Sequence, residues 1–177
     1  MLLTVGRMDA RERYKGHDRV IAALPTLVAK GHDVVYVVVG EGDDVARLKR
    51  LAVETGVMDR VIFLGPVFSE RLVDAYRMAD LFVMPSKGEG FGIAFLEAIA
   101  CGTPALGLAA CGARDALADG ELGTVVPENA LASGIAGLLA QPKHEPHSLA
   151  NAVRARFGRE HFEWAVRGIA RRLLRAA

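Results

Sequence analysis

The sequence lacks the features that would set it apart from ordinary globular proteins. It has 2 cysteines in 177 residues, and no apolar run approaches the roughly 20 residues of a membrane-spanning helix. Cys101 and Cys111 stand in apolar or glycine-rich surroundings, so we expect no disulfide framework and a reducing, cytoplasmic setting. The first apolar stretch ends at Gly6, too early for the apolar part of a secretion signal.

An excess of charge of one sign is lacking too. The formal net charge is +1, so the whole chain has no general attraction for nucleic acid, and any anion site must be local. The 5 histidines are scattered, and no pair of them stands at metal-ligand spacing with a cysteine or a carboxylate. We therefore expect neither a nucleic-acid partner nor a metal site.

Six short apolar runs alternate with segments of helical periodicity. Most runs are apolar throughout, as strands are when helices cover both faces of a parallel sheet. This order predicts a Rossmann-like, doubly wound α/β fold with a mostly parallel six-stranded sheet and helices on both faces. Asp43 and Ser69 are predicted to cap two of the helices. The predicted strands are Leu2–Val5, Val34–Val39, Val61–Leu64, Leu81–Met84, Ala105–Leu108 and Thr124–Val126.

We expect one domain over residues 1–177, with a core over about 1–140 and helices over about 147–177. The residues from Asn151 onward form one or two helices, with a break near Phe157-Gly158. Seven arginines in this stretch outnumber two glutamates. A membrane-facing or acceptor-facing patch is one interpretation, and a solvated helix face, which is the commoner case, is the other.

The segment Gly88-Glu89-Gly90-Phe91-Gly92 carries the clearest functional signal. It follows a predicted strand and precedes a predicted helix, where the ligand sites of doubly wound sheets lie. Three alternating glycines allow the backbone N–H groups to approach a ligand, and the helix N-terminus adds partial positive charge. The sequence therefore predicts a phosphate site in this loop.

Two carboxylates accompany the glycine loop. Glu97 is the single polar residue of a helix that is apolar all round, so we expect it to be buried and to need partners. A ribose diol could supply two donors, but a structural glutamate bonded to backbone N–H groups or to an arginine fits equally well. Glu89 lies within the loop, where it could accept bonds from sugar hydroxyls or simply face solvent.

Arg7 and Lys15 flank the segment after the first strand, beside Gly6 and Gly16. Two cations on this edge could neutralise a pyrophosphate, although each alone could be an ordinary surface charge. A dinucleotide site is not expected, because no G-x-G-x-x-G follows the first strand. A serine hydrolase is not expected either, because the G-x-S-x-G elbow is missing.

These segments together resemble the retaining GT-B glycosyltransferases of the large family often called group 1 or family 4. The resemblance covers nearly the whole chain to about Leu139. Its motifs are Val5-Gly6-Arg7 with Lys15-Gly16, Val38-Val39-Gly40-Glu41-Gly42, Val61-Ile62-Phe63-Leu64-Gly65, Glu89 and Glu97 at the spacing E-x7-E, Ala100-Cys101-Gly102-Thr103-Pro104, and Asp119-Gly120-Glu121-Leu122-Gly123.

The resemblance implies a donor-binding C-terminal domain for a UDP-sugar or a GDP-sugar. It implies that Arg7 and Lys15 contact the diphosphate, that Glu89 meets the transferred sugar and that Glu97 meets the ribose. The turn near Val67 would border the base. The implied catalytic residues are Arg7, Lys15 and Glu89, and the implied donor-binding residues are Gly6, Val67, Gly90, Phe91, Gly92, Ile93 and Glu97.

The implied reaction transfers a hexosyl group to a sugar or lipid-linked acceptor with retention of anomeric configuration and without a metal or cofactor. Peripheral contact with the inner face of a membrane fits such an acceptor. The acceptor-binding N-terminal domain of the family is expected to be absent, which would leave the isolated chain inactive. Two alternatives stay open: a stand-alone nucleotide-binding or partner-binding module without catalysis, and a phosphorylase-like or epimerase enzyme of the same fold.

Overall fold

A computed structural model describes residues 1–141 and 145–175. The six predicted strands form one sheet in the order β3-β2-β1-β4-β5-β6, and all neighbouring pairs are parallel. The predicted mostly parallel sheet is thus wholly parallel. The strands are β1 (Leu2–Val5), β2 (Tyr36–Val39), β3 (Val61–Gly65), β4 (Leu81–Met84), β5 (Ala105–Leu108) and β6 (Thr124–Val126).

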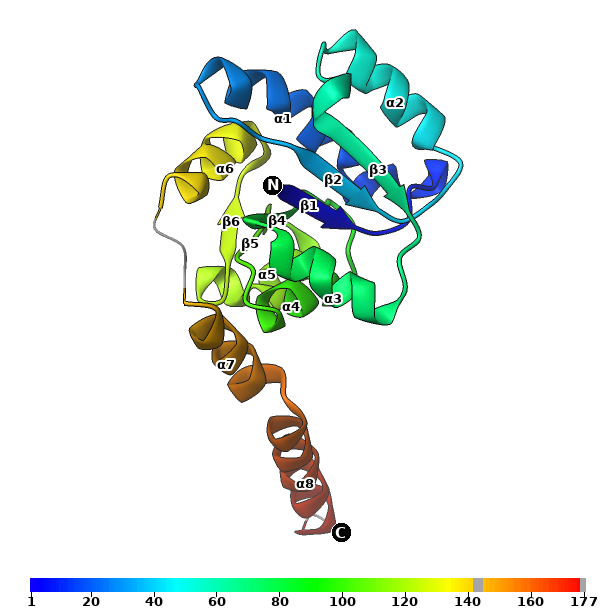
Figure 1. Cartoon of the computed structure of the whole chain (residues 1–177). Coiled ribbons are helices and arrows are strands. Elements are labelled where there is room, and N and C mark those ends of the chain that lie inside the picture. The colour runs from blue at the N-terminus through cyan, green and yellow to red at the C-terminus, as the bar shows by residue number, and fades with distance from the viewer. Residues whose placement is uncertain (142–144, 176–177) are drawn as a thin grey trace.

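Helices connect the strands and cover both faces of the sheet (Figure 1). α1, α2 and α6 lie on one face, and α3, α4, α5 and α7 pack on the other. This is the predicted doubly wound arrangement. The helices are α1 (His17–Ala29), α2 (Val45–Glu54), α3 (Ser69–Met78), α4 (Ile93–Ala100), α5 (Cys111–Ala116), α6 (Leu131–Leu139), α7 (Pro146–Phe157) and α8 (Arg159–Arg175).

Most of the strands are apolar throughout because alternate residues pack into two cores. In β2, Tyr36 and Val38 face the core under α1, α2 and α6, whereas Val37 and Val39 face the core under α3, α4 and α5. All four residues of β2, β4 and β5 are buried. Because both faces of these strands are buried, functional side chains can reach solvent only from the ends of the strands and from the loops that follow them.

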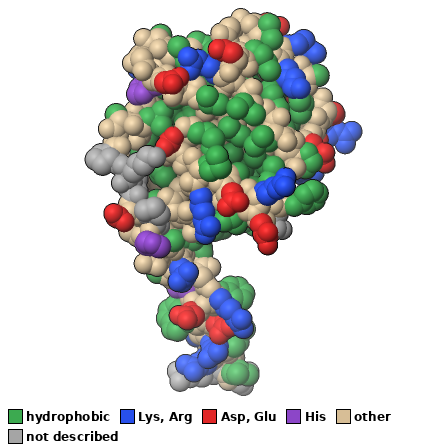
Figure 2. Space-filling model, viewed as in Figure 1, with side chains coloured by type: hydrophobic (Ala, Val, Ile, Leu, Met, Phe, Trp, Pro, Cys, Tyr) green, Lys and Arg blue, Asp and Glu red, His purple; other side chains and the backbone are tan. Residues whose placement is uncertain are grey.

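The helical cover stops short of the sheet edge at β3. Val61 and Phe63 pack into the core under α1 and α2, so the alternate residues Ile62 and Leu64 face the other side, where they are 45% and 52% exposed. Figure 2 shows hydrophobic side chains gathered on this face of the sheet. The edge strand is therefore the most apolar exposed part of the sheet.

The chain ends in two helices separated by Gly158, as the sequence predicted. α7 packs on α4, and α8 contacts α7 but extends away from the sheet (Figure 1). The last two residues of the predicted helical stretch, Ala176 and Ala177, lie outside the described residues. In the part of the chain that is described, no helix combines the length and apolarity needed to cross a membrane.

Candidate functional site

The candidate site lies where the strand order reverses, between β1 and β4. In open α/β sheets, the loops beyond the carboxyl ends of such neighbouring strands frame a ligand site. The loop after β1 comprises residues 6–16, including the 3-10 helix η1 (Ala10–Lys15), and the loop after β4 comprises residues 85–92. The Lys87 amide donates to the Tyr14 carbonyl at 2.9 Å, so the two loops are in direct contact.

Gly16 allows this close packing. Its φ of +83° lies in the left-handed region, and a Cβ added there would lie 2.4 Å from the carbonyl oxygen of Pro85. A side chain at this position would force the two loops apart. The glycine is therefore required by the approach of the loops, independently of any ligand.

A pocket of about 340 Å³ opens between these loops. Its volume lies at the lower end of the range of about 300–1,000 Å³ that is typical of small-molecule sites. Five of the ten predicted site residues line it, and the other five do not. The lining residues are Val5, Lys15, Met84, Glu89, Phe91, Gly92, Ile93 and Ala94.

The two predicted phosphate-binding cations share one carboxylate, Glu12. The Arg7 guanidinium donates to Glu12 Oε1, and Lys15 Nζ lies 3.3 Å from Glu12 Oε2. Glu12 has non-helical backbone angles (φ −113°, ψ 23°) and forms a kink within η1, and Lys15 follows it by three residues at ion-pair distance. Glu12 was not singled out from the sequence. Its position three residues before Lys15 could have indicated that the two side chains pair.

Lys15 and Arg7 differ in how they reach the site. The Lys15 side chain is 15% exposed and lines the pocket, whereas Arg7 is 67% exposed and lies outside the lining. A Cβ on Gly6 would lie 3.6 Å from both Cδ and Nζ of Lys15, so the lysine runs directly alongside Gly6. A distance of 3.6 Å is an ordinary van der Waals contact, so the lysine packs against Gly6 without requiring a glycine there.

Glu89 lines the pocket and has one unsatisfied carboxylate oxygen. Its Oε1 is buried and accepts no hydrogen bond from the described residues. A buried acceptor without a partner is unfavourable by about 1–3 kcal/mol. Any donor that reached this oxygen would remove that cost.

The glycine loop is fixed from behind by α5. The Gly112 amide donates to the Glu89 carbonyl at 3.1 Å, and a Cβ on Gly112 would lie 2.5 Å from the Gly90 carbonyl oxygen. Gly92, with a φ of +87°, then caps the N-terminus of α4. The first N–H groups of a helix lack intrahelical partners, so the start of α4 directs donors toward this edge of the pocket.

Glu97 is not buried, contrary to the expectation from its apolar helix. α4 buries Phe95, Ala98 and Ile99, and Glu97 lies on its exposed side. Its Oε2 accepts a hydrogen bond of 2.8 Å from the Tyr76 hydroxyl. The apolar sequence of α4 predicted a helix buried on every side. In the structure only one side of α4 packs on the sheet, and Glu97 lies on another.

Tyr76 holds Glu97 in place as a neutral donor. Burial raises the pKa of Tyr76 far above its ordinary value, and the hydrogen bond to Glu97 and its negative charge raise it further. The phenol therefore stays protonated. Neither Glu97 nor Val67, which packs half-buried against the core under α3 and α4, lines the pocket.

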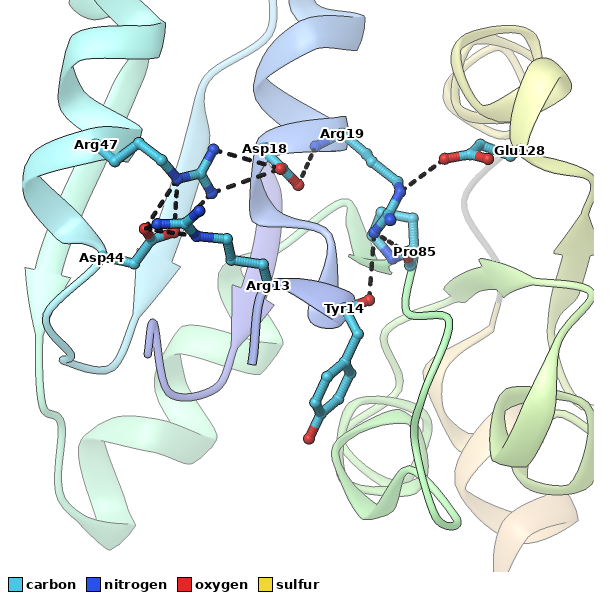
Figure 3. Close-up of polar contacts among 8 residues, drawn as sticks. All are labelled: Arg13, Tyr14, Asp18, Arg19, Asp44, Arg47, Pro85 and Glu128. Carbon is cyan, nitrogen blue, oxygen red and sulfur yellow. Dashed lines mark hydrogen bonds and ion pairs between the residues drawn. The ribbon is translucent and has the colours of Figure 1, made fainter. Parts of the chain in front are cut away.

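The loop after β1 is anchored on one side by Asp44, just before α2. This carboxylate is 4% exposed and accepts bonds from Arg47 Nη2 at 2.6 Å and Arg13 Nε at 3.0 Å (Figure 3). Burial raises the pKa of Asp44, but the bonds from Arg47 and Arg13 outweigh burial and hold that pKa below its ordinary value. On the other side, Arg19 reaches toward Pro85 and Glu128 (Figure 3).

His17, the first residue of α1, is a buried neutral histidine. It is 4% exposed, and its Nε2 has no hydrogen-bond partner among the described residues. Burial lowers the pKa of His17 to about 4, and the positive charge of Lys15 contributes to the decrease. Protonation of His17 therefore favours the unfolded chain as the pH falls.

This predicts a pH-dependent loss of stability. Because the pKa falls from 6.5 to about 4 on folding, the contribution of His17 is complete above pH 6.5 and is lost as the pH falls toward 4. Between pH 7.5 and 5.0 the wild type should lose about 2 kcal/mol more unfolding free energy than His17→Gln, measured by urea denaturation. His161→Gln, at an exposed site on α8, should retain the wild-type pH dependence. Parallel curves for the wild type and His17→Gln would contradict the assignment.

Another cavity lies at the opposite end of the sheet. It has a volume of about 730 Å³, and Asp33, Arg77, Cys101 and Thr103 are among its lining residues. No predicted site residue lines it. Across residues 1–141 and 145–175, no three histidine, cysteine, aspartate or glutamate side chains cluster as a metal site would require.

Comparison with curated proteins gives long matches. The GDP-mannose-dependent α-(1-6)-phosphatidylinositol monomannoside mannosyltransferase of Mycolicibacterium smegmatis is 34% identical over 165 residues, which cover 87% of this chain and 42% of that protein. D-inositol 3-phosphate glycosyltransferase 2 of Catenulispora acidiphila is 39% identical over 172 residues, which cover 89% and 40%. The chain thus spans about two fifths of the length of these relatives.

A solved structure and a family model agree with these sequence matches. Sucrose-phosphate synthase from Thermosynechococcus elongatus superimposes with a TM-score of 0.80 at 30% identity, over 99% of this chain and 46% of that one. The family model described as glycosyl transferases group 1 matches residues 1–156. The chain therefore belongs to the group 1 glycosyl transferases.

Proposed function

We propose that this chain is the donor-binding C-terminal domain of a retaining GT-B glycosyltransferase of family 4. The observation that carries the proposal is one pocket with Lys15 on one side, Glu89 on another and the N-terminus of α4 at its edge. A cation and a helix N-terminus suit a diphosphate. An unsatisfied carboxylate oxygen suits a sugar hydroxyl.

In the proposed complex, Lys15 and Arg7 bind the diphosphate of a UDP-sugar or GDP-sugar. Glu89 accepts a bond from the sugar, Glu97 from the ribose, and the backbone from Gly90 to Ile93 contacts phosphate and sugar. The bond between the anomeric carbon and the diphosphate oxygen breaks as the acceptor oxygen bonds to that carbon on the same face, and the proton of the acceptor hydroxyl passes to the departing diphosphate. The two cations stabilise the negative charge on the departing nucleotide, which would make a metal unnecessary.

The names of the relatives support this donor and acceptor class. One is a GDP-mannose-dependent enzyme that acts on a phosphatidylinositol mannoside, and another is an inositol phosphate glycosyltransferase. From these relatives we infer that the parent protein transfers a hexosyl group to a sugar or lipid-linked acceptor. A cytoplasmic protein with peripheral contact at the inner face of a membrane fits such a substrate.

We further propose that the isolated chain binds the donor but does not catalyse transfer. The relatives are more than twice as long as the part that matches. The part of the relatives that this chain does not match has room for an acceptor-binding N-terminal domain. Transfer activity that appears only when such a domain is added would separate this proposal from a binding module without catalysis.

A thermal-shift and calorimetric panel of UDP, GDP, ADP and their sugars tests the proposal. A ligand at 100 times its Kd stabilises the folded chain by about 2.7 kcal/mol. We expect one nucleotide series to give this response and Glu97→Ala to reduce its affinity. Glu163→Ala, at a glutamate on α8, is the matched control and should bind as the wild type does. The absence of a response to any nucleotide would contradict the proposal.

A further inference from the structure

Arg19 joins three segments that are distant in the sequence. It lies in the first turn of α1, and its Nη1 donates to the carbonyl oxygens of Tyr14 and Pro85, both at 3.2 Å. Its Nε donates to Glu128 Oε1 at 2.8 Å. Figure 3 shows this side chain between the loop after β1, the loop after β4 and the segment after β6.

The two carbonyl groups belong to the loops that frame the pocket. Tyr14 immediately precedes Lys15, and Pro85 opens the segment that leads to Glu89. The Tyr14 carbonyl also accepts a hydrogen bond of 2.9 Å from the Lys87 amide. The loop after β1 is therefore joined to the loop after β4 both directly and through Arg19. The separation of Lys15 from Glu89 therefore depends on this junction.

Glu128, which follows β6 and lies 109 positions after Arg19, completes the junction. Its Oε1 accepts from Arg19 at 2.8 Å, and its Oε2 lies 2.7 Å from Lys87 Nζ. Exposed ion pairs of this kind contribute little to global stability. Their effect here is geometric, because one carboxylate fixes both the guanidinium and the loop that the guanidinium holds.

We propose that Arg19 is a positioning residue that sets the spacing between Lys15 and Glu89 and thereby the affinity for the diphosphate sugar. Arg19 does not line the pocket, so it acts through the two loops. The effect on affinity rests on the function proposed above. A planar guanidinium can direct separate N–H groups at two carbonyls and a carboxylate, which the compact ammonium of lysine reproduces poorly.

The test compares Arg19→Gln, Arg19→Lys and Glu128→Gln with the matched control Arg60→Gln. Arg60 also donates to a carbonyl and a carboxylate, those of Val34 and Asp33 at 3.2 and 2.9 Å, but it lies away from the pocket. Hydrogen exchange of the ligand-free chain is the first measurement. The Lys87 amide should exchange about tenfold faster in Arg19→Gln and unchanged in Arg60→Gln.

Ligand affinity is the second measurement. Arg19→Gln should raise the Kd of the nucleotide sugar about tenfold and leave that of the matching nucleoside within about twofold, because the nucleoside does not span the two loops. Arg19→Lys and Glu128→Gln should give intermediate values. A merely structural role would weaken both ligands in parallel.

The outcomes separate the inference from the proposed function. Wild-type exchange at Lys87 in Arg19→Gln, or equal weakening of both ligands, would overturn the role of Arg19. So would the same changes in Arg60→Gln. If the wild type binds no nucleotide, the proposed function fails, and the exchange of the Lys87 amide still decides whether Arg19 holds the loops together.

Discussion

Lys15→Gln is expected to weaken the binding of a nucleoside diphosphate by about 30-fold, which corresponds to about 2 kcal/mol. The substitution removes the one cation that lines the pocket among the described residues. It also leaves the buried Oε2 of Glu12, 3.3 Å from Lys15 Nζ in the wild type, without a positive neighbour at that position. Isothermal titration calorimetry at low salt measures the loss.

Two further variants decide how that loss arises. Lys30→Gln removes an exposed lysine at the other end of α1 and should leave the affinity unchanged. Lys15→Gln combined with Glu12→Gln should recover part of the affinity, because it removes a negative charge near the diphosphate that Lys15 no longer offsets. Wild-type affinity in Lys15→Gln would rule out this lysine as a ligand of the diphosphate.

Phe95→Ala is expected to lower the unfolding free energy by about 3–5 kcal/mol, a large part of the 5–15 kcal/mol typical of a domain. Phe95 is fully buried, and its ring meets that of Phe82 edge-on at 5.6 Å between centroids. A Cβ added to Gly92 or Gly107 would lie within 2.9 Å of the ring, so Phe95 fills the space between α4 and β5 tightly. Urea denaturation at pH 7.5 measures the change.

Phe162→Ala is the matched control for this substitution. Phe162 is 66% exposed on α8, so the same truncation should change stability by no more than about 0.5 kcal/mol. A loss below about 1 kcal/mol in Phe95→Ala would mean that the cavity collapses. That result would contradict the tight packing of Phe95 against Gly92 and Gly107.

The sheet was predictable because burial on both faces dictates its sequence. Leu81–Met84 and Ala105–Leu108 are apolar at every position, and both strands have the predicted bounds. The strand predicted from Val34 begins instead at Tyr36. Val34 is buried as well, so an apolar pattern alone could not distinguish the strand from the buried segment before it.

The two predicted helix caps were wrong, because neither residue holds the position just before its helix. The residue before α2 is Asp44, and Asp43 instead accepts a bond of 2.7 Å from the Ala10 amide through Oδ1. Ser69 is the first residue of α3, and Phe68 precedes it in extended conformation. Local cap preferences could not anticipate a bond between the loops that follow β1 and β2.

The candidate site was predictable in its loops but not in its supporting contacts. The glycine pattern and the strand that precedes it located the loop that contains Glu89 and lies beside Lys15. The Arg19 and Glu128 pair joins residues 109 positions apart, and nothing in the local sequence indicates that they meet. The exposure of Glu97 likewise depends on which side of α4 faces the sheet.

The most direct test is a titration of the 15N-labelled chain with the nucleotide sugar that gives the largest thermal shift, followed by amide chemical shifts. We expect saturation at a 1:1 ratio and the largest shifts at Lys15, Gly90, Phe91, Gly92 and Ile93. Shifts that instead gather around Cys101 and Thr103, or no shifts at saturating ligand, would contradict a donor site between the loops after β1 and β4.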